Sequence, residues 1–237
     1  MTITLLYRVF FLYARLTVVA TVTYECLSNT TCGCSLKSAV LSRIIGGEQA
    51  DINSWGWAAS ISVGNSHICG GTLISSTLVL TAAHCLSSLT SLSRLYVNLA
   101  SNSLSTIGQQ RSVSNIYIHR DYDSETLIND IAMIRLSSAI DMTDPSIALI
   151  CLPLNMTTTY PPVNRNVVAI GWGVLSADSK TTSDILQQVT LKTSSNSASN
   201  CQQLIRNQQC QFCAGVQQGG KGIESNLDKR KAPLVFI

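Results

Sequence analysis

Charged residues are scarce in this chain: Asp, Glu, Lys and Arg make up 12% of its 237 residues. Bases and acids are nearly balanced, 16 against 13, and the formal net charge is +3. Residues 1–23 contain two of the arginines and no acid, so the remainder holds 14 basic and 13 acidic residues. No basic patch is expected from this balance, and nucleic acid is excluded as an expected partner.

Metal-ligand spacing is also missing. The chain has three histidines, and no group of His, Cys, Asp or Glu shows the spacing of a zinc site. The stretch Asn98–Leu104 carries no acid that could bind calcium. We therefore expect neither a metal nor another cofactor.

Long helical patterns are absent as well, because no segment of useful length repeats its apolar residues every 3.6 positions. Short alternating segments are instead separated by Ser, Asn and Gly clusters, which favours an antiparallel barrel or sandwich. A hydrophobic content of 46% is enough to fill a sizeable core. Strands are expected over 58–63, 71–74, 78–82, 95–98, 111–118, 131–136, 167–172 and 187–193, and a short helix over 199–205.

Residues 1–23 have the outline of a secretory signal peptide, with early positive charge at Arg8 and small residues near Ala20. Arg15 divides the apolar run, whereas a membrane span needs about 20 mostly apolar residues, so a membrane anchor is the weaker alternative. We expect a secreted, extracellular monomer without membrane contact. Nine cysteines then imply a disulfide framework with one thiol left over. Asn29 and Asn155 each begin an Asn-X-Thr glycosylation acceptor.

Two residues suggest proton-transfer chemistry. His84 stands in residues 80–85 (LTAAHC), among small residues at the end of an apolar segment, and a rigidly held histidine suits a general base. Asp130 stands in residues 127–134 with apolar residues on both sides, and burying an unpaired carboxylate is costly. Taken alone, His84 also fits a structural histidine and Asp130 a turn or N-cap residue.

These stretches occur in order with residues 43–47 (RIIGG), 68–73 (ICGGTL), 129–136 (NDIAMIRL) and 171–173 (GWG). Together they resemble the trypsin and chymotrypsin family of serine endopeptidases, peptidase family S1. The resemblance implies an all-β fold of two antiparallel six-stranded barrels and peptide-bond hydrolysis by a Ser-His-Asp triad. His84 would be the general base, and Asp130 would orient it and stabilise its protonated form. The implied partners are protein or peptide substrates and an activating protease.

The same resemblance divides the chain into a signal peptide (1–23), a propeptide (24–43) and a peptidase domain (44–237). Cleavage after Arg43 would free the ammonium of Ile44, which in the family buries itself against the aspartate before the nucleophile. The implied disulfides are Cys69 with Cys85, Cys201 with Cys213, and Cys151 with Cys34 or alternatively Cys32, Cys26 taking the other one. Cys210 would be the leftover thiol, or would replace Cys213 in its pair.

The resemblance stops after Lys221, where the family continues into the base of the specificity pocket, a cysteine and Gly-Asp-Ser-Gly-Gly-Pro. Counting forward places Asp228 at the serine position, and counting back from Pro233 places Arg230 there. Ser225 lacks the flanking glycines and aspartate. No nucleophile is therefore assigned, and the second barrel is expected to be incomplete after about residue 221.

Two hypotheses follow from this departure. The first is a trypsin-like endopeptidase whose present chain is inactive, for instance because the stretch from Gly222 is a translated intron or a wrongly joined exon. The second is a non-catalytic serine protease homologue that acts as a secreted binding module through its first barrel. An intact His84 and Asp130 favour the first hypothesis.

Overall fold

The computed structural model describes residues 21–24, 26, 30–42, 47–153, 161–175, 181–199, 201–215 and 235–236. Most of the predicted signal peptide lies outside these ranges. Arg43 and Ile44, the expected cleavage site, and the expected glycosylation sites Asn29 and Asn155 also lie outside the described residues. The assignments made for them remain predictions.

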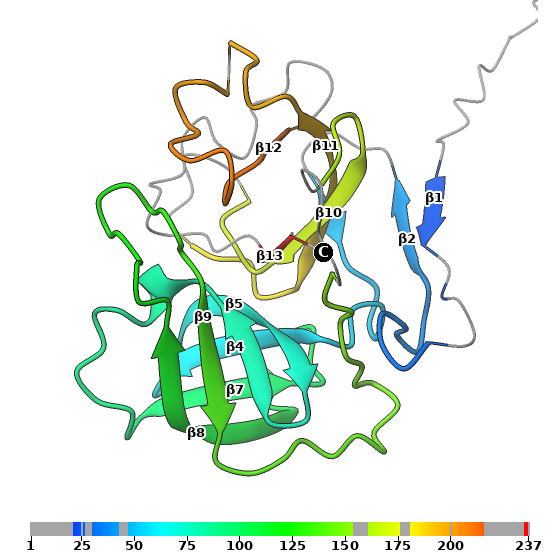
Figure 1. The fold of residues 1–237 in the computed structure, drawn as a ribbon. Coiled ribbons are helices and arrows are strands. Elements are labelled where there is room, and N and C mark those ends of the chain that lie inside the picture. Colours follow the sequence, from blue (N-terminus) through cyan, green and yellow to red (C-terminus); the bar gives the residue numbers. More distant parts are fainter. Residues whose placement is uncertain are drawn as a thin grey trace, which may run out of the picture.

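Six antiparallel strands close into a barrel in the order β4-β5-β6-β9-β8-β7, and β7 pairs back onto β4 (Figure 1). Side chains alternate along these strands, as in β9, where Ala132, Ile134 and Leu136 are buried and the residues between them are exposed. This period of two is what the sequence predicts for a half-buried strand. The strands are β4 (Ala58–Val63), β5 (Ser66–Ser75), β6 (Leu78–Thr81), β7 (Leu95–Leu99), β8 (Gln109–Ile118) and β9 (Ala132–Leu136).

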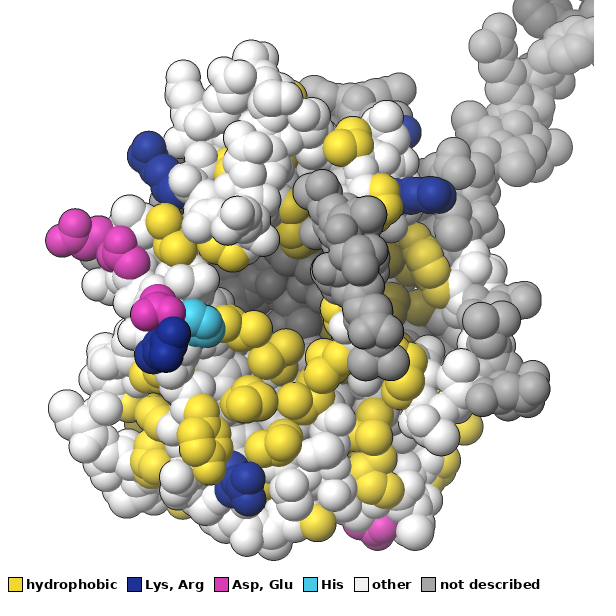
Figure 2. Space-filling view, viewed as in Figure 1, with side chains coloured by type: hydrophobic (Ala, Val, Ile, Leu, Met, Phe, Trp, Pro, Cys, Tyr) yellow, Lys and Arg dark blue, Asp and Glu magenta, His cyan; other side chains and the backbone are white. Residues whose placement is uncertain are grey.

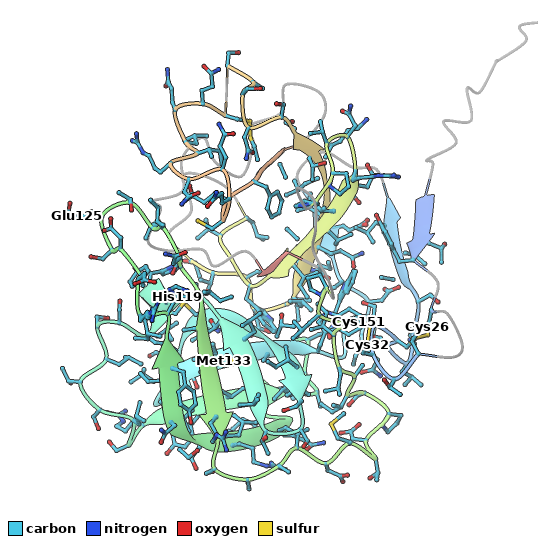
Figure 3. All side chains as sticks on the ribbon, in the orientation of Figure 1. Cys26, Cys32, His119, Glu125, Met133 and Cys151 are labelled. Atoms are coloured by element: carbon cyan, nitrogen blue, oxygen red, sulfur yellow. A yellow bond between two sulfur atoms is a disulfide. The ribbon has the colours of Figure 1, made fainter. Side chains whose placement is uncertain are left out.

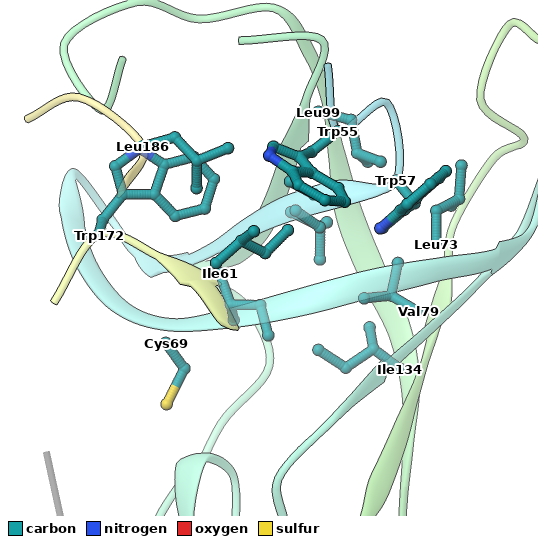
Figure 4. Close-up of a cluster of buried hydrophobic side chains, with 14 of the residues drawn as sticks. Trp55, Trp57, Ile61, Cys69, Leu73, Val79, Leu99, Ile134, Trp172 and Leu186 are labelled. Atoms are coloured by element: carbon teal, nitrogen blue, oxygen red, sulfur yellow. The ribbon is translucent and has the colours of Figure 1, made fainter. Parts of the chain in front are cut away.

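The hydrophobic core fills this barrel and continues beyond it (Figure 4). Ile61, Leu73 and Ile134 are fully buried between the strands. Trp55 and Trp57 precede β4 and pack edge to face, with ring centroids 5.8 Å apart. The same cluster includes residues that follow or precede strands outside the barrel, so one core holds the two halves of the molecule together.

A second sheet has the strand order β12-β11-β10-β13, with β3 paired to β11 (Figure 1). The all-β class and the first six-stranded barrel are thus confirmed, and within the described residues the second unit is a five-stranded open sheet. Its strands are β3 (Glu48–Gln49), β10 (Asn166–Gly171), β11 (Gln187–Ser194), β12 (Cys213–Gly215) and β13 (Val235–Phe236).

The segment before the expected cleavage site packs against this body. β1 (Thr21–Tyr24) and β2 (Ala39–Ser42) form an antiparallel pair, and β1 overlaps the end of the predicted signal peptide. Leu41 of β2 is 1% exposed and belongs to the main core. Burial of such a side chain contributes about 1.5–3 kcal/mol relative to exposure, so the N-terminal segment is part of the fold.

The preferred pairing of Cys34 with Cys151 is wrong. Cys32 bonds Cys151, and Cys34 bonds Cys26. The reason is the turn at Gly33, which has a φ of 76° and donates its N–H to the Leu149 carbonyl at 2.7 Å. A Cβ on Gly33 would lie 3.1 Å from the Cys151 sulfur, so the chain passes Cys151 with Cys32 directed toward it.

The structure contains the Cys69–Cys85 and Cys201–Cys213 bonds, and Cys210 is a free, exposed thiol. The prediction of a short helix over 199–205 is wrong, because the described residues in this range form hydrogen-bonded turns. The disulfide at Cys201 and the Asn196 side chain, which bonds the Gln211 carbonyl and the Cys213 N–H, fold this stretch back on itself.

Candidate active site

Strand pairing brings the two predicted catalytic residues together. β6 and β9 are antiparallel with Thr81 opposite Ala132, so β6 leaves the barrel where β9 enters it. The residues just after Thr81 and just before Ala132 therefore emerge at the same rim. After β6 the chain forms the single turn η1 (Ala83–Cys85), whose buried Ala83 leaves room only for a small side chain.

His84 and Asp130 meet through two hydrogen bonds. The His84 ring nitrogen Nδ1 lies 2.6 Å from Asp130 Oδ2, and the His84 backbone N–H donates to Asp130 Oδ1 at 2.8 Å. Both carboxylate oxygens are therefore committed to one residue. The side chains are 12% and 20% exposed, so the pair is shielded on most sides, yet solvent still reaches it.

The loop before β9 sets the position of this carboxylate. Leu127 and Asn129 both adopt positive φ, at 55° and 56°, and the Asn129 side chain donates to the Asp121 carbonyl at 2.9 Å. Nearby, burial and the negative charge of Asp130 raise the pKa of Tyr122. Tyr122 is thus an uncharged neighbour of the pair at physiological pH, which the sequence did not indicate.

The disulfide between Cys69 and Cys85 ties the turn that carries His84 to β5. The two sulfurs and a His84 ring nitrogen lie within 4.8 Å of one another. Sulfur binds metals as a thiolate, however, and here both sulfurs are consumed in the disulfide. This cluster therefore restrains His84 and is no metal site in the disulfide-bonded protein.

A second, half-buried histidine was not singled out in the sequence. His67 on β5 has its Nδ1 2.8 Å from Ser60 Oγ of β4, and burial lowers its pKa to about 4. Its ring packs edge to face on Trp172, with centroids 5.7 Å apart. Trp172 follows β10, so a neutral imidazole joins the first barrel to the second sheet.

Gln188 of β11 is another residue that no sequence pattern identified. It is 3% exposed and accepts a hydrogen bond from Trp55 Nε1 at 2.8 Å. Its own Nε2 donates to the Val40 carbonyl at 2.9 Å and to Glu48 Oε1 at 3.3 Å. These two partners lie on either side of residues 43–46, so one buried amide holds both ends of the expected cleavage segment.

Similarity to known proteins identifies the family of this chain. The family model described as Trypsin matches residues 44–225, most of the chain, and this range includes both His84 and Asp130. The chain belongs to the trypsin family. This trypsin-family chain is 39% identical over 156 residues to Trypsin alpha of Drosophila melanogaster, which covers 65% of the chain and 58% of that relative.

A second relative is Transmembrane protease serine 11C of Mus musculus, 36% identical over 179 residues that cover 74% of this chain and 40% of that protein. The trypsin-family chain therefore spans less than two thirds of the length of either curated relative. Among solved structures, human heparin binding protein has the same fold, with a TM-score of 0.65 and 24% identity over 82% of this chain and 80% of that chain. Among the described residues no helix is long and apolar enough to cross a bilayer.

Proposed function

We propose that the gene for this chain encodes a secreted trypsin-like serine endopeptidase. We further propose that the polypeptide with the present sequence does not itself hydrolyse peptide bonds. The observation that carries the enzymatic part is the His84–Asp130 pair, 2.6 Å apart within the matched trypsin region. The proposal that the present chain is inactive is supported by its sequence, which contains no Gly-Asp-Ser-Gly-Gly.

The pair is arranged for general base catalysis. With the proton of Nδ1 held toward Asp130, the other ring nitrogen of His84 keeps its lone pair and can accept a proton. In a complete triad this nitrogen takes the proton of the serine hydroxyl as the serine attacks the peptide carbonyl, and then delivers it to the leaving amine. Loss of the serine lowers turnover by roughly a millionfold, so the base alone is not sufficient.

Activation after Arg43 by an arginine-directed protease is part of the same proposal. The described strands β2 and β3 flank the cleavage segment, and Cys32–Cys151 would keep the N-terminal segment attached after the cut. Four disulfides in the described residues favour an oxidising compartment, which agrees with secretion.

A non-catalytic binding module is the second candidate. It is favoured by a closed first barrel in a sequence without the serine motif, and by exposed apolar side chains on that barrel (Figure 2). Tyr117, Ile131 and Met133 are 42%, 44% and 37% exposed on or beside β8 and β9.

A chimera tests the proposal. Residues from Gly222 onward are replaced by the corresponding part of Drosophila melanogaster Trypsin alpha, and both chains are cleaved after Arg43 and assayed with a fluorogenic arginine peptide. We expect no turnover by the native chain, turnover by the chimera, and a loss of roughly a millionfold in the chimera with His84→Ala.

The two parts of the proposal fail differently. A folded chimera without activity overturns the enzymatic part and favours the binding module. If the native chain hydrolyses the substrate and His84→Ala abolishes this turnover, the proposal that the native chain is inactive is wrong.

A further inference from the structure

Three potential metal ligands meet at the rim of the first barrel. Cys69 of β5 and Cys85 of η1 contribute their sulfurs and His84 a ring nitrogen, and these atoms lie within 4.8 Å of one another. Among the described residues this is the one group of three or more His, Cys or acidic side chains close enough to hold a metal ion. Cys69 precedes Cys85 by 16 positions, which is not the spacing of a zinc motif, so only the tertiary structure reveals the group.

Reduction changes what this group can do. In the structure the two sulfurs form a disulfide, and they have no thiolate to offer a metal. Two molecules of a thiol such as glutathione break the Cys69–Cys85 bond, become one disulfide themselves, and leave two protonated cysteines. A zinc ion then replaces the two thiol protons, which pass to the solvent. Reduction thus converts a restraint on His84 into a ligand set of two thiolates and an imidazole.

The distances suit zinc. Zinc bonds a thiolate at about 2.3 Å and an imidazole nitrogen at about 2.0–2.1 Å, so tetrahedral geometry separates these two ligand atoms by about 3.6 Å. Cys85 Sγ and His84 Nε2 are 3.6 Å apart in the structure. Two zinc-bound sulfurs lie about 3.8 Å apart by the same geometry. The Cα atoms of Cys69 and Cys85 are 6.1 Å apart, so side-chain rotation alone provides this separation once the bond is broken.

The imidazole is already oriented for a metal. Asp130 Oδ2 lies 2.6 Å from His84 Nδ1, which leaves the lone pair on Nε2, the nitrogen that faces Cys85 Sγ. A carboxylate on the other ring nitrogen is the usual partner of a zinc-binding histidine, because it fixes the tautomer and raises the basicity of the ligand. The His84 side chain is 12% exposed, so an ion reaches the group from solvent on the histidine side.

The ligands keep their places without the disulfide. Cys69 stands inside β5, which is paired with β4 and β6. The turn η1 is closed by two backbone N–H groups that donate to the Ala83 carbonyl, at 3.0 and 2.9 Å. The His84 N–H donates to Asp130 Oδ1 at 2.8 Å. Hydrogen bonds therefore fix both elements that carry the ligands.

We propose that the reduced form of this chain binds one zinc ion through Cys69, Cys85 and His84, with Asp130 behind the histidine and water in the fourth position. Two thiolates and an imidazole favour zinc over magnesium or calcium. The ion occupies the lone pair of His84 Nε2, so reduction in the presence of zinc removes the general base and oxidation restores it. This loss of the base rests on the proposed catalytic function, whereas the metal site does not.

The N-terminal disulfides provide an internal control. Figure 3 labels Cys26, Cys32 and Cys151 beside β1 and β2, away from His119. His119 marks the rim that carries the ligand group, because its N–H donates to the carbonyl of Ile131, just before β9. Since no second group of three ligands occurs in the described part of the chain, zinc should leave the reduction of Cys32–Cys151 unchanged.

The test is the equilibrium reduction of the full native chain in glutathione redox buffers, with and without a buffered excess of free zinc. Rapid alkylation and mass spectrometry measure the thiol fraction of each cysteine separately. With free zinc at about a hundred times the Kd of the site, the equilibrium constant for reducing Cys69–Cys85 should rise by roughly a hundredfold. The constant for Cys32–Cys151, measured in the same samples, should not change.

His84→Ala should abolish the zinc effect, and Asp130→Asn should weaken zinc binding by roughly 10–100-fold. His119→Gln is the matched control, since this histidine is exposed and lies outside the ligand group. A Cys69–Cys85 equilibrium that zinc does not shift would overturn the proposal. A shift that persists in His84→Ala, or that is equal at Cys32–Cys151, would overturn it as well, because zinc would then bind free thiols without this group.

Discussion

The six-stranded barrel and the sheet of β10 to β13 differ in how their edges are treated. In the barrel every strand has two neighbours, because β7 pairs with β4 and closes the ring. In the second sheet β12 and β13 are edges in the described structure, with three and two residues. His84 and Asp130 both stand on the closed unit. The barrel alone therefore positions the proposed acid–base pair, His84 and Asp130, whereas a nucleophile has to come from another part of the protein.

The largest expected effect concerns that geometry. In the chimera described above, Asp130→Asn should lower turnover by about ten-thousandfold, because the amide no longer fixes the His84 tautomer that can accept a proton. Steady-state kinetics measure this loss. Asn129→Asp, next in sequence and bonded to a carbonyl by its side chain, should cost far less. Similar losses in the two variants would show that the loop, and not the Asp130 carboxylate, sets the rate.

Core truncation compares the two units directly. Ile134→Ala in the barrel should cost about 2–5 kcal/mol of unfolding free energy, because closed pairing prevents collapse around the cavity. Leu191→Ala in β11, 2% exposed and of equal size, should cost less, because an open sheet can relax. Urea unfolding of both variants measures the difference. An equal or larger cost for Leu191→Ala would contradict the comparison.

The contact between the two units should depend on pH. The pKa of His67 falls from 6.5 to about 4 because the ring is buried. The unfolded chain therefore binds a proton that the folded chain rejects between these values, so this stabilisation is present above pH 6.5 and is lost as the pH falls toward 4.

The expected size is on the order of 1–3 kcal/mol, and His67→Gln should flatten the stability profile between pH 6.5 and 4. Urea unfolding at several pH values measures it. His119→Gln, at an exposed position, is the control. Parallel profiles for the native chain and His67→Gln would remove His67 as the cause.

The smallest expected effect concerns the hold of the second sheet on the cleavage segment. Gln188→Leu removes the bonds to Val40 and Glu48, so cleavage after Arg43 by a limiting amount of trypsin should be roughly three- to tenfold faster. Mass spectrometry of the fragment that begins at Ile44 follows the reaction. Gln187→Leu is the control, because the Gln187 side chain donates to Ser183 Oγ and the Ile185 carbonyl, which lie close to it in sequence. Equal rates would show that Gln188 does not restrain the segment.

Sequence patterns predicted the barrel strands well where side chains alternate. The bounds expected for β4 match, and those for β6, β7 and β9 differ by one residue, since one face of each strand is buried. β5 begins earlier than expected, at Ser66, because its first residues include a serine and a histidine that pair with β4. β1 to β3 were not predicted, because such short segments become strands only when a distant partner strand is present.

The two residues of the proposed acid–base pair were predicted from local motifs, and their neighbours were not. His84 and Asp130 stand in stretches that resemble the trypsin family, and a buried carboxylate requires a partner. Gln188, His67 and Tyr122 carry no comparable signal, because an amide, an imidazole and a phenol are common at exposed positions. Their roles follow from burial and from partners that are distant in the chain.

The sequence by itself determined the family, the alternation of the barrel strands, the absence of the serine motif and the choice of His84 and Asp130 as the candidate pair. These depend on local order and composition, which the chain carries in any conformation. Tertiary structure decided that Cys32 and not Cys34 meets Cys151, because the chain makes a left-handed turn at Gly33 beside Cys151 and Cys34 bonds Cys26 instead. It also decided the hold of Gln188 on the cleavage segment, since these contacts exist only after distant segments pack together.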